Sequence, residues 1–162
     1  DNRGTMRIRV ISIGKTNIDF VKEGIEMYEQ RIRRYINFEW EELQDVKNSA
    51  KLKQPMLKLT EGEAILKRLQ PNEFVVLLDE HGKQKSSEHL ADFFQNHFNY
   101  SGQNLCFVIG GAYGFSEEMY ERANIKLGLS KMTFSHQLVR VILCEQIYRA
   151  FTIIRCEPYH HA

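Results

Sequence analysis

The stretch from Lys126 to His161, KLGLSKMTFSHQLVRVILCEQIYRAFTIIRCEPYHH, decides how this chain folds. It joins a short strand-like run, a polar loop, a helix with apolar residues on almost every side, and a tail of aromatic and imidazole groups. Between Leu138 and Ile154 only five positions are strongly polar, so this helix can expose little of its surface to water. We therefore expect the helix to be buried, either in its own core or against a second copy of the protein.

Arg140 lies on the apolar stripe of this helix. On a 3.6-residue period it falls in line with Leu143, Ile147 and Phe151. A cation in such a stripe needs a partner or a ligand, because an unpaired charge is costly to bury. Arg140 is therefore the first indication of a functional site.

Length and composition bound the class of protein. The chain has 162 residues, of which 43% are hydrophobic and 27% charged, and this predicts one soluble globular domain from Met6 to Ala162. Residues 1–5 precede the first methionine and are expected to be a remnant of expression cloning. No signal peptide is expected, and no apolar run approaches the roughly 20 residues of a membrane span. The three cysteines form no CxxC pair and are expected to be reduced, which favours a cytoplasmic protein without a membrane partner.

Apolar periodicity predicts alternating strands and helices. The strand-like runs are 8–13, 38–43, 74–78, 105–109 and a short run that ends at 129. Helices are expected at 19–35, from Pro55 through a Thr60–Glu63 capping box to Leu69, from Ser86 or Ser87 to Phe98, from Ser116, and at 138–154. Segments 45–54 and 79–83 are polar and predict loops. The alternation indicates an α/β fold, with a mostly parallel sheet and helices on both faces.

Three loops carry the residues of chemical interest. In an open parallel sheet ligands bind at the carboxyl ends of the strands, so these loops follow Leu78, Ile109 and Leu129. The glycine-rich second loop, Gly110 to Gly114, lets backbone N–H groups approach a ligand, although Gly-Gly after a strand is more often a tight turn. The chain contains neither GxGxxG nor GxxxxGK[ST], which disfavours a Rossmann-type dinucleotide enzyme and a P-loop hydrolase.

Several polar groups have more than one interpretation. The six histidines show no spacing typical of a metal site, so no metal is expected. His136 is either a helix-start residue or a ligand contact. Glu145 and Arg149 stand four residues apart, and simple pairing is the commoner outcome. The net charge of +1 gives no general argument for a nucleic-acid partner. Three arginines near the end of the first helix suit either the helix dipole or a phosphate contact: Arg31, Arg33 and Arg34.

Four motifs taken together resemble one known family. They are LLDEHGK (77–83), FVIGGAYG (107–114), LSKMTFSHQLVRVILCEQIYRAF (129–151) and PYHH (158–161). Over essentially the whole chain from Met6, they resemble the RlmH family, SPOUT-class methyltransferases of bacterial large-subunit ribosomal RNA. The resemblance implies a C-terminal trefoil knot, a homodimer, and S-adenosylmethionine bound in the knot, with no metal. The chain departs from the family pattern at Cys156, where we expect glycine.

The resemblance also implies a reaction. Members of the family methylate N3 of a pseudouridine in helix 69, the 23S rRNA hairpin that bridges the subunits of the 70S ribosome. Backbone groups would hold the adenine and ribose of the methyl donor at Leu78, Gly110, Leu129, Ser130, Lys131, Met132, Thr133 and Phe134.

The ring nitrogen of the acceptor carries a proton that must leave. The candidates for positioning and proton handling are Arg140, Glu145, Tyr159 and His160. His160 is the natural base, because histidine changes protonation nearest to neutral pH. The alternative function is a non-catalytic ribosome-associated RNA-binding protein of the same fold.

Overall fold

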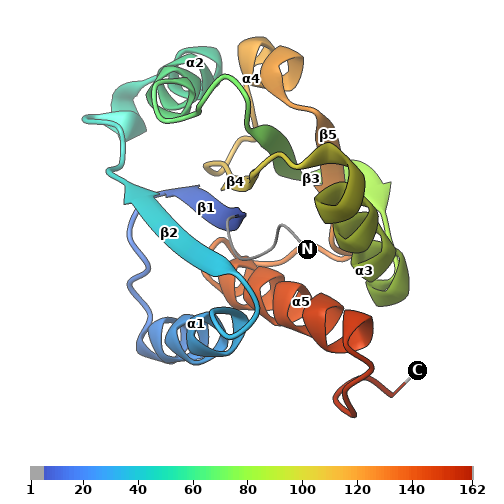
Figure 1. Ribbon diagram of the computed structural model, residues 1–162. Coiled ribbons are helices and arrows are strands. Elements are labelled where there is room, and N and C mark those ends of the chain that lie inside the picture. Colours follow the sequence, from blue (N-terminus) through green and yellow to red (C-terminus); the bar gives the residue numbers. More distant parts are fainter. Residues whose placement is uncertain (1–5, 162) are drawn as a thin grey trace.

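Five parallel strands form the sheet in the computed structural model, which describes residues 6–161 (Figure 1). Every neighbouring pair of strands is parallel, so their carboxyl ends share one edge of the sheet. This arrangement confirms the predicted α/β class. The remnant expected at residues 1–5 lies outside the described residues. Across the sheet the order is β2 (Asn37–Leu43), β1 (Arg7–Ile13), β4 (Leu105–Ile109), β3 (Phe74–Gln84) and β5 (Ile125–Gly128).

Helices cover both faces of the sheet, as predicted (Figure 1). Successive strand residues point to opposite faces, so Phe107 and Val108 of β4 are both fully buried, in two separate cores. The Phe107 core is covered by α1 (Asp19–Ile32), α3 (Ser87–Asn96) and α5 (Leu138–Ile154). The Val108 core is covered by α2 (Gln54–Leu66) and α4 (Glu117–Arg122).

The start of α2 corrects one sequence prediction. The predicted capping box at Thr60 is wrong, because Thr60 lies inside the helix and its hydroxyl donates a 2.9 Å hydrogen bond to the carbonyl of Met56. The helix begins at Gln54, and Pro55 lies in its first turn as predicted, where the missing N–H of proline has no cost. Of the two candidate caps Ser86 and Ser87, Ser86 caps α3, and Ser116 caps α4, the helix that it was expected to open.

The third strand is longer than its apolar run indicates. The sequence predicts a loop at 79–83, but β3 continues to Gln84 through a register shift in which Leu127 of β5 pairs with both Leu78 and Lys83. Backbone pairing does not need apolar side chains, so the apolar pattern missed this extension. An added Cβ at Gly82 would lie 2.7 Å from the carbonyl carbon of Leu127, and glycine is therefore required here. The trefoil knot stays a prediction.

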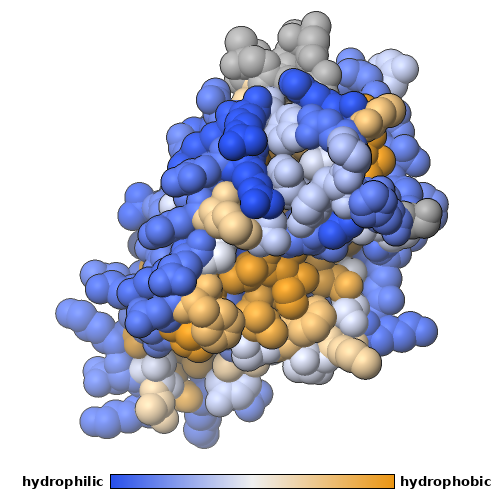
Figure 2. All heavy atoms as spheres, turned by 90° about the horizontal axis from the view of Figure 1, so that it is seen from below, coloured by the Kyte–Doolittle hydropathy of each residue, from blue (hydrophilic) through white to orange (hydrophobic). Residues whose placement is uncertain are grey.

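Helix α5 packs between α1 and α3 and begins and ends where the sequence predicts. Its outer side carries half-buried Val141 and Ile142. Together with the exposed Ile18, Phe20 and Leu138, these residues belong to the α1–α5 side of the molecule, where Figure 2 shows a continuous apolar area. Within residues 6–161 no helix has both the length and the hydropathy of a membrane span.

Candidate functional site

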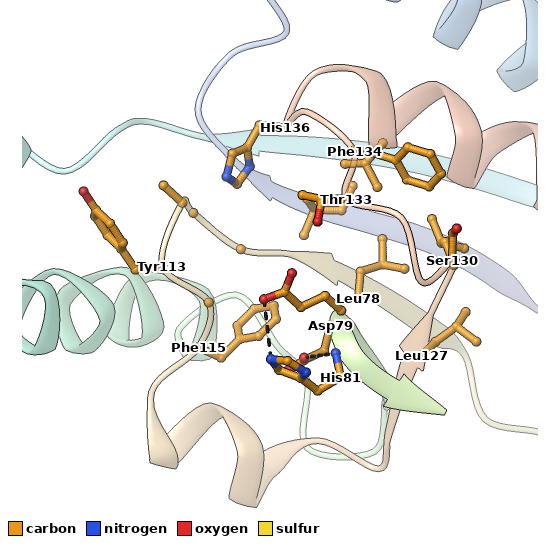
Figure 3. Close-up of a pocket in the computed structure, with 18 of the residues that line it drawn as sticks. Leu78, Asp79, His81, Tyr113, Phe115, Leu127, Ser130, Thr133, Phe134 and His136 are labelled. Carbon is orange, nitrogen blue, oxygen red and sulfur yellow. Dashed lines mark hydrogen bonds and ion pairs between the residues drawn. The ribbon is translucent and has the colours of Figure 1, made fainter. Parts of the chain in front are cut away.

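A cavity of about 460 Å³ lies at the carboxyl ends of β3, β4 and β5 (Figure 3). Thr133 and His136 lie on one side of it, with Leu78 and Asp79 across from them and Tyr113 at one end. Its volume is in the range of about 300 to 1,000 Å³ that is usual for small-molecule sites. The three loops that the sequence singled out therefore meet around one cavity.

Most of the residues expected to hold the methyl donor line this cavity. Lys131 is the exception, because it is exposed and does not line the cavity. The other seven do: Leu78, Gly110, Leu129, Ser130, Met132, Thr133 and Phe134. Their contacts with a donor stay predictions.

The loop after β5 presents unpaired backbone donors. Its one internal hydrogen bond is short-range, from the N–H of Met132 to the Ser130 hydroxyl at 2.9 Å. Among the residues that the structure describes, the N–H groups of Lys131, Thr133 and Phe134 have no partner in the protein. Backbone donors need a partner, which is water or a ligand. This loop can therefore bind the polar edge of a flat ligand.

Packing explains both glycines that follow β4. A Cβ at Gly110 would lie 2.8 Å from Cε1 of Phe115, whose ring is part of the cavity wall. A Cβ at Gly111 would collide with the carboxylate of Glu61, which is 7% exposed. Burial raises the pKa of Glu61. Glycine is therefore needed at both positions because a larger side chain would clash with neighbouring residues of the protein that shape the loop.

Arg140 of α5 forms hydrogen bonds with residues at and just after the end of β1, and it does not line the cavity. Its Nη1 donates to the carbonyl of Gly14 at 3.0 Å and to the hydroxyl of Thr16 at 2.9 Å. Its Nη2 donates to the carbonyl of Ile13 at 2.9 Å, and the side chain is 1% exposed. These contacts are the partners that the sequence pattern required. Partial burial, and then the charge of Arg140, lower the pKa of His136 in the cavity wall, which favours the neutral imidazole.

The other three proton-handling candidates meet beside the middle and later turns of α5, where the tail folds back against the helix. Arg149 joins them: its Nε and Nη2 donate to Glu145 at 3.0 and 2.6 Å, and its Nη1 lies 2.9 Å from Nδ1 of His160. The Tyr159 hydroxyl donates to Glu145 at 3.1 Å, and Nε2 of His160 lies 2.8 Å from a carboxylate oxygen of Glu88. A guanidinium can only donate, so Nδ1 of His160 accepts and Nε2 carries the proton.

Arg149 is the member of this network that the sequence reasoning left out. The predicted pairing with Glu145 is confirmed, but the same guanidinium also lies 4.7 Å from the centre of the Tyr159 ring and contacts His160. The signal available in the sequence was the short connection between α5 and the PYHH tail. Burial, followed by hydrogen bonding to Tyr28, raises the pKa of Tyr159, which therefore stays a donor at neutral pH.

The two groups of candidate residues lie at different places along α5. At 1.5 Å per residue, Glu145 and Arg149 are about 9 and 15 Å along the helix axis from Val139. The cavity lies at its first turn, where Val139 is part of the wall, and none of the tail residues lines it. Within residues 6–161 no three His, Cys, Asp or Glu side chains are placed to hold a metal ion, and the metal-free reaction stays a prediction.

Comparison with known proteins identifies the family. Residues 6–160 match the family described as "Predicted SPOUT methyltransferase". A protein of Christiangramia forsetii named ribosomal RNA large subunit methyltransferase H is 51% identical over 156 residues, which cover 96% of this chain and 99% of that protein. A protein of the same name from Geotalea daltonii is 47% identical over 96% of this chain and 100% of its own length.

Solved structures support the fold independently. A methylase family protein from Haemophilus influenzae has a TM-score of 0.52 at 10% identity, covering 99% of this chain and 72% of that one. A methylase family protein from Neisseria gonorrhoeae has a TM-score of 0.51 at 12% identity, covering 100% of this chain and 88% of that one. With a parallel sheet, a loop-lined cavity at its carboxyl edge and a family match over nearly its full length, the chain belongs to the SPOUT methyltransferase family.

Proposed function

We propose that this protein transfers a methyl group from S-adenosylmethionine to N3 of a pseudouridine in helix 69 of 23S rRNA, acting in the cytoplasm on the assembled 70S ribosome. Residues from Met6 onward would act as one methyltransferase domain. The observation that carries the proposal is the cavity at the carboxyl edge of the sheet, in a chain of this family whose relatives are named for large-subunit rRNA methylation.

The residues around the cavity fit the proposed donor. When bound, S-adenosylmethionine supplies an electrophilic methyl group on a sulfonium. Leu78 and Leu129 provide apolar walls suited to the faces of an adenine. The unpaired N–H groups of Thr133 and Phe134, two residues that line the cavity, suit its polar edge or the ribose. Together these groups orient the donor and limit the access of water.

The apolar area on α1 and α5 supports a homodimer (Figure 2). Phe20 is 63% exposed, and Ile18 and Leu138 are exposed as well. A self-complementary contact across a twofold axis would cover this surface. Sedimentation at micromolar concentration should give about twice the chain mass. Phe20→Asp should shift the population to monomer, whereas Lys22→Asp, at an exposed polar position of the same helix, should not.

The dimer would also bring the two groups of candidate residues together. The tail contacts Glu145 and Arg149, about 9 to 15 Å along α5 from Val139 in the cavity wall, and does not line its own cavity. If two α5 helices pack antiparallel, the end of one lies beside the start of the other. We infer that Glu145, Tyr159 and His160 of one subunit act at the cavity of its partner, where a carboxylate or an imidazole would take up the imide proton of the acceptor. Arg149 orients both groups through its hydrogen bonds.

One experiment tests the proposed function. The protein is incubated with labelled S-adenosylmethionine and 70S ribosomes from a strain that lacks the endogenous enzyme, and the modified nucleotide is mapped. Label on N3 of one helix 69 pseudouridine is the expected result. Donor binding with no transfer to ribosomes would instead support the non-catalytic RNA-binding alternative. Label elsewhere in the RNA would contradict the proposed acceptor.

A further inference from the structure

Two arginines make cation–π contacts with tyrosine rings beside the tail. The guanidinium carbon of Arg31, near the end of α1, is 5.7 Å from the ring centre of Tyr28 and 5.4 Å from that of Tyr148. The guanidinium carbon of Arg155, after α5, is 5.0 Å from the ring centre of Tyr35. We call these five residues the arginine–tyrosine ridge.

The charges of the ridge are held in place without being neutralised. Neither Arg31 nor Arg155 has a carboxylate within 4.0 Å or a side-chain hydrogen bond among the residues that the structure describes, whereas nearby Arg33 pairs with Glu29 at 3.1 Å. Cation–π contact orients a guanidinium but leaves its N–H edge free. The acid closest in sequence to Arg155, Glu157, accepts a 2.7 Å hydrogen bond from the Tyr35 hydroxyl.

The aromatic part of the ridge is continuous with the proposed acceptor groups. Tyr148 packs on Tyr28 and Tyr35, with ring centres 6.0 and 6.3 Å apart, and meets Tyr159 edge-on at 4.8 Å. The Tyr159 ring in turn carries the guanidinium of Arg149. A nucleotide presented to the tail would therefore have its neighbours in the RNA strand pass over the ridge.

Resting on the proposed function, we propose that the arginine–tyrosine ridge binds the rRNA strand that flanks the target nucleotide. Arg31 and Arg155 would each contact a phosphate through the guanidinium edge, and an unstacked loop base would stack on the guanidinium plane. The net charge of +1 gives the protein no general attraction to RNA, so local unpaired cations must supply it. RNA provides an anion for both arginines, whereas the apolar surface proposed for the dimer provides none.

The test compares two double variants that lose the same charge. Arg31→Gln with Arg155→Gln removes the ridge cations and keeps similar side-chain length. Lys51→Gln with Lys67→Gln removes two exposed cations, one just before α2 and one at its end, on the other face of the sheet. Ribosome affinity is measured by co-sedimentation, and single-turnover methylation is measured over a range of ribosome and salt concentrations.

For the ridge variant we expect the affinity for ribosomes to fall about tenfold and the KM for ribosomes to rise by the same factor. The slope of log K against log salt should become shallower by about 0.7 to 0.9 for each lost phosphate contact. The maximal rate at saturating ribosomes, the affinity for S-adenosylmethionine and the sedimentation mass should stay at wild-type values. The lysine variant should match wild type in every measurement. Arg31→Lys with Arg155→Lys keeps both charges and should retain the salt slope.

Distinct results would overturn the ridge or the proposed function. If the Gln variant keeps the wild-type ribosome affinity and salt slope, and the wild type is active, then the ridge does not bind RNA and the proposed function still stands. A changed sedimentation mass would show that the ridge contacts a second subunit instead of RNA. A lower maximal rate with unchanged ribosome affinity would also overturn RNA binding. Wild-type protein that binds ribosomes without methylating them would overturn the proposed function alone, and wild-type protein that does not bind ribosomes would overturn both.

Discussion

Cys156 occupies a backbone conformation that favours glycine. Its φ of 55° lies in the left-handed region. Its N–H donates to the carbonyl of Ile153 at 3.1 Å, and the N–H of Glu157 donates to the carbonyl of Thr152 at 2.9 Å. These two bonds form a Schellman motif at the end of α5, whose left-handed residue is most often glycine. The glycine expected from the family pattern therefore has a physical reason.

Replacing Cys156 with glycine should stabilise the protein. A left-handed conformation costs an L-residue about 1 to 2 kcal/mol, and the greater freedom of glycine in the unfolded chain offsets part of that gain. We expect a net increase of about 1 kcal/mol in the free energy of unfolding, measured by urea titration. Cys156→Ala, which keeps the Cβ, is the control and should show no such gain. If the Gly variant is no more stable than the Ala variant, the left-handed backbone at position 156 is not strained.

His97 should make the stability of the fold depend on pH. Its Nε2 lies 2.8 Å from the carbonyl of Gln103, and because a carbonyl only accepts, that nitrogen carries the proton. Burial lowers the pKa of His97 in the folded state. As pH falls through about 6.5 the unfolded chain takes up the proton first, so the free energy of unfolding is highest above that pH and decreases below it.

His97→Gln should flatten this dependence, because glutamine can donate to the same carbonyl without titrating. The loss of unfolding free energy between pH 7.5 and pH 5.0 should be smaller in the variant, by about 1.4 kcal/mol for each unit by which the pKa of His97 is lowered. Urea titrations at the two pH values measure it. His89→Gln, at an exposed position, is the control. If wild type and His97→Gln lose the same unfolding free energy between these two pH values, burial of His97 is not the cause of the pH dependence.

At the scale of elements, Gly111 in the loop after β4 should not tolerate an added methyl group. In Gly111→Ala the new Cβ enters the space of the Glu61 carboxylate, so either this buried side chain or the loop that lines the cavity must shift. We expect the affinity for S-adenosylmethionine to fall tenfold or more, about 1.4 kcal/mol, in calorimetry. Glu61→Ala added to Gly111→Ala frees that space and should restore part of the affinity. Strictly additive losses in the double variant would contradict the contact.

The sequence predicted elements wherever side-chain burial follows a period. The bounds of β4 and α5 match the prediction because most of the buried positions in those segments are apolar. The extension of β3 was missed because backbone groups, not side chains, pair its polar residues with β5. The Thr60–Glu63 pair was misinterpreted as a cap because a Thr–Glu pair at capping-box spacing also occurs inside helices. A knot leaves no periodic signal, so it could be expected only from resemblance.

The candidate site was predictable in part for a similar reason. The cavity residues belong to motifs at strand ends, and the carboxyl edge of a parallel sheet is where such residues meet. The role of Arg140 was not predictable, because its partners are carbonyls that any sequence supplies. Nor was the meeting of Arg149 with His160, which depends on the turn at Cys156 folding the tail back along α5.

At the scale of the whole molecule, α5 contacts both the cavity residues and the tail residues, at different positions along its length. Its first turn lies at the cavity, and its last turns hold the tail through Arg149. A monomer therefore keeps the proposed donor site and the proposed acceptor groups apart. The apolar area between them, on the α1–α5 side of the molecule, is the surface through which a second copy would bring them together (Figure 2).

This arrangement predicts that two inactive variants restore each other. Gly110→Val moves Phe115 and damages the cavity but keeps the tail, and deletion of residues 158–162 removes the tail but keeps the cavity. Each variant alone should lose about 10²- to 10⁴-fold in single-turnover methylation of ribosomes, and the deletion should still bind the donor.

After co-refolding, half of the dimers are mixed, and each mixed dimer has one intact cavity facing an intact tail from its partner. Activity should therefore return to about a quarter of the wild-type value. Each variant co-refolded with itself is the control and should stay inactive. In a mixture shown by mass to contain mixed dimers, activity no higher than that of the parents would mean that tail and cavity of the same chain work together, because no chain in the mixture has both.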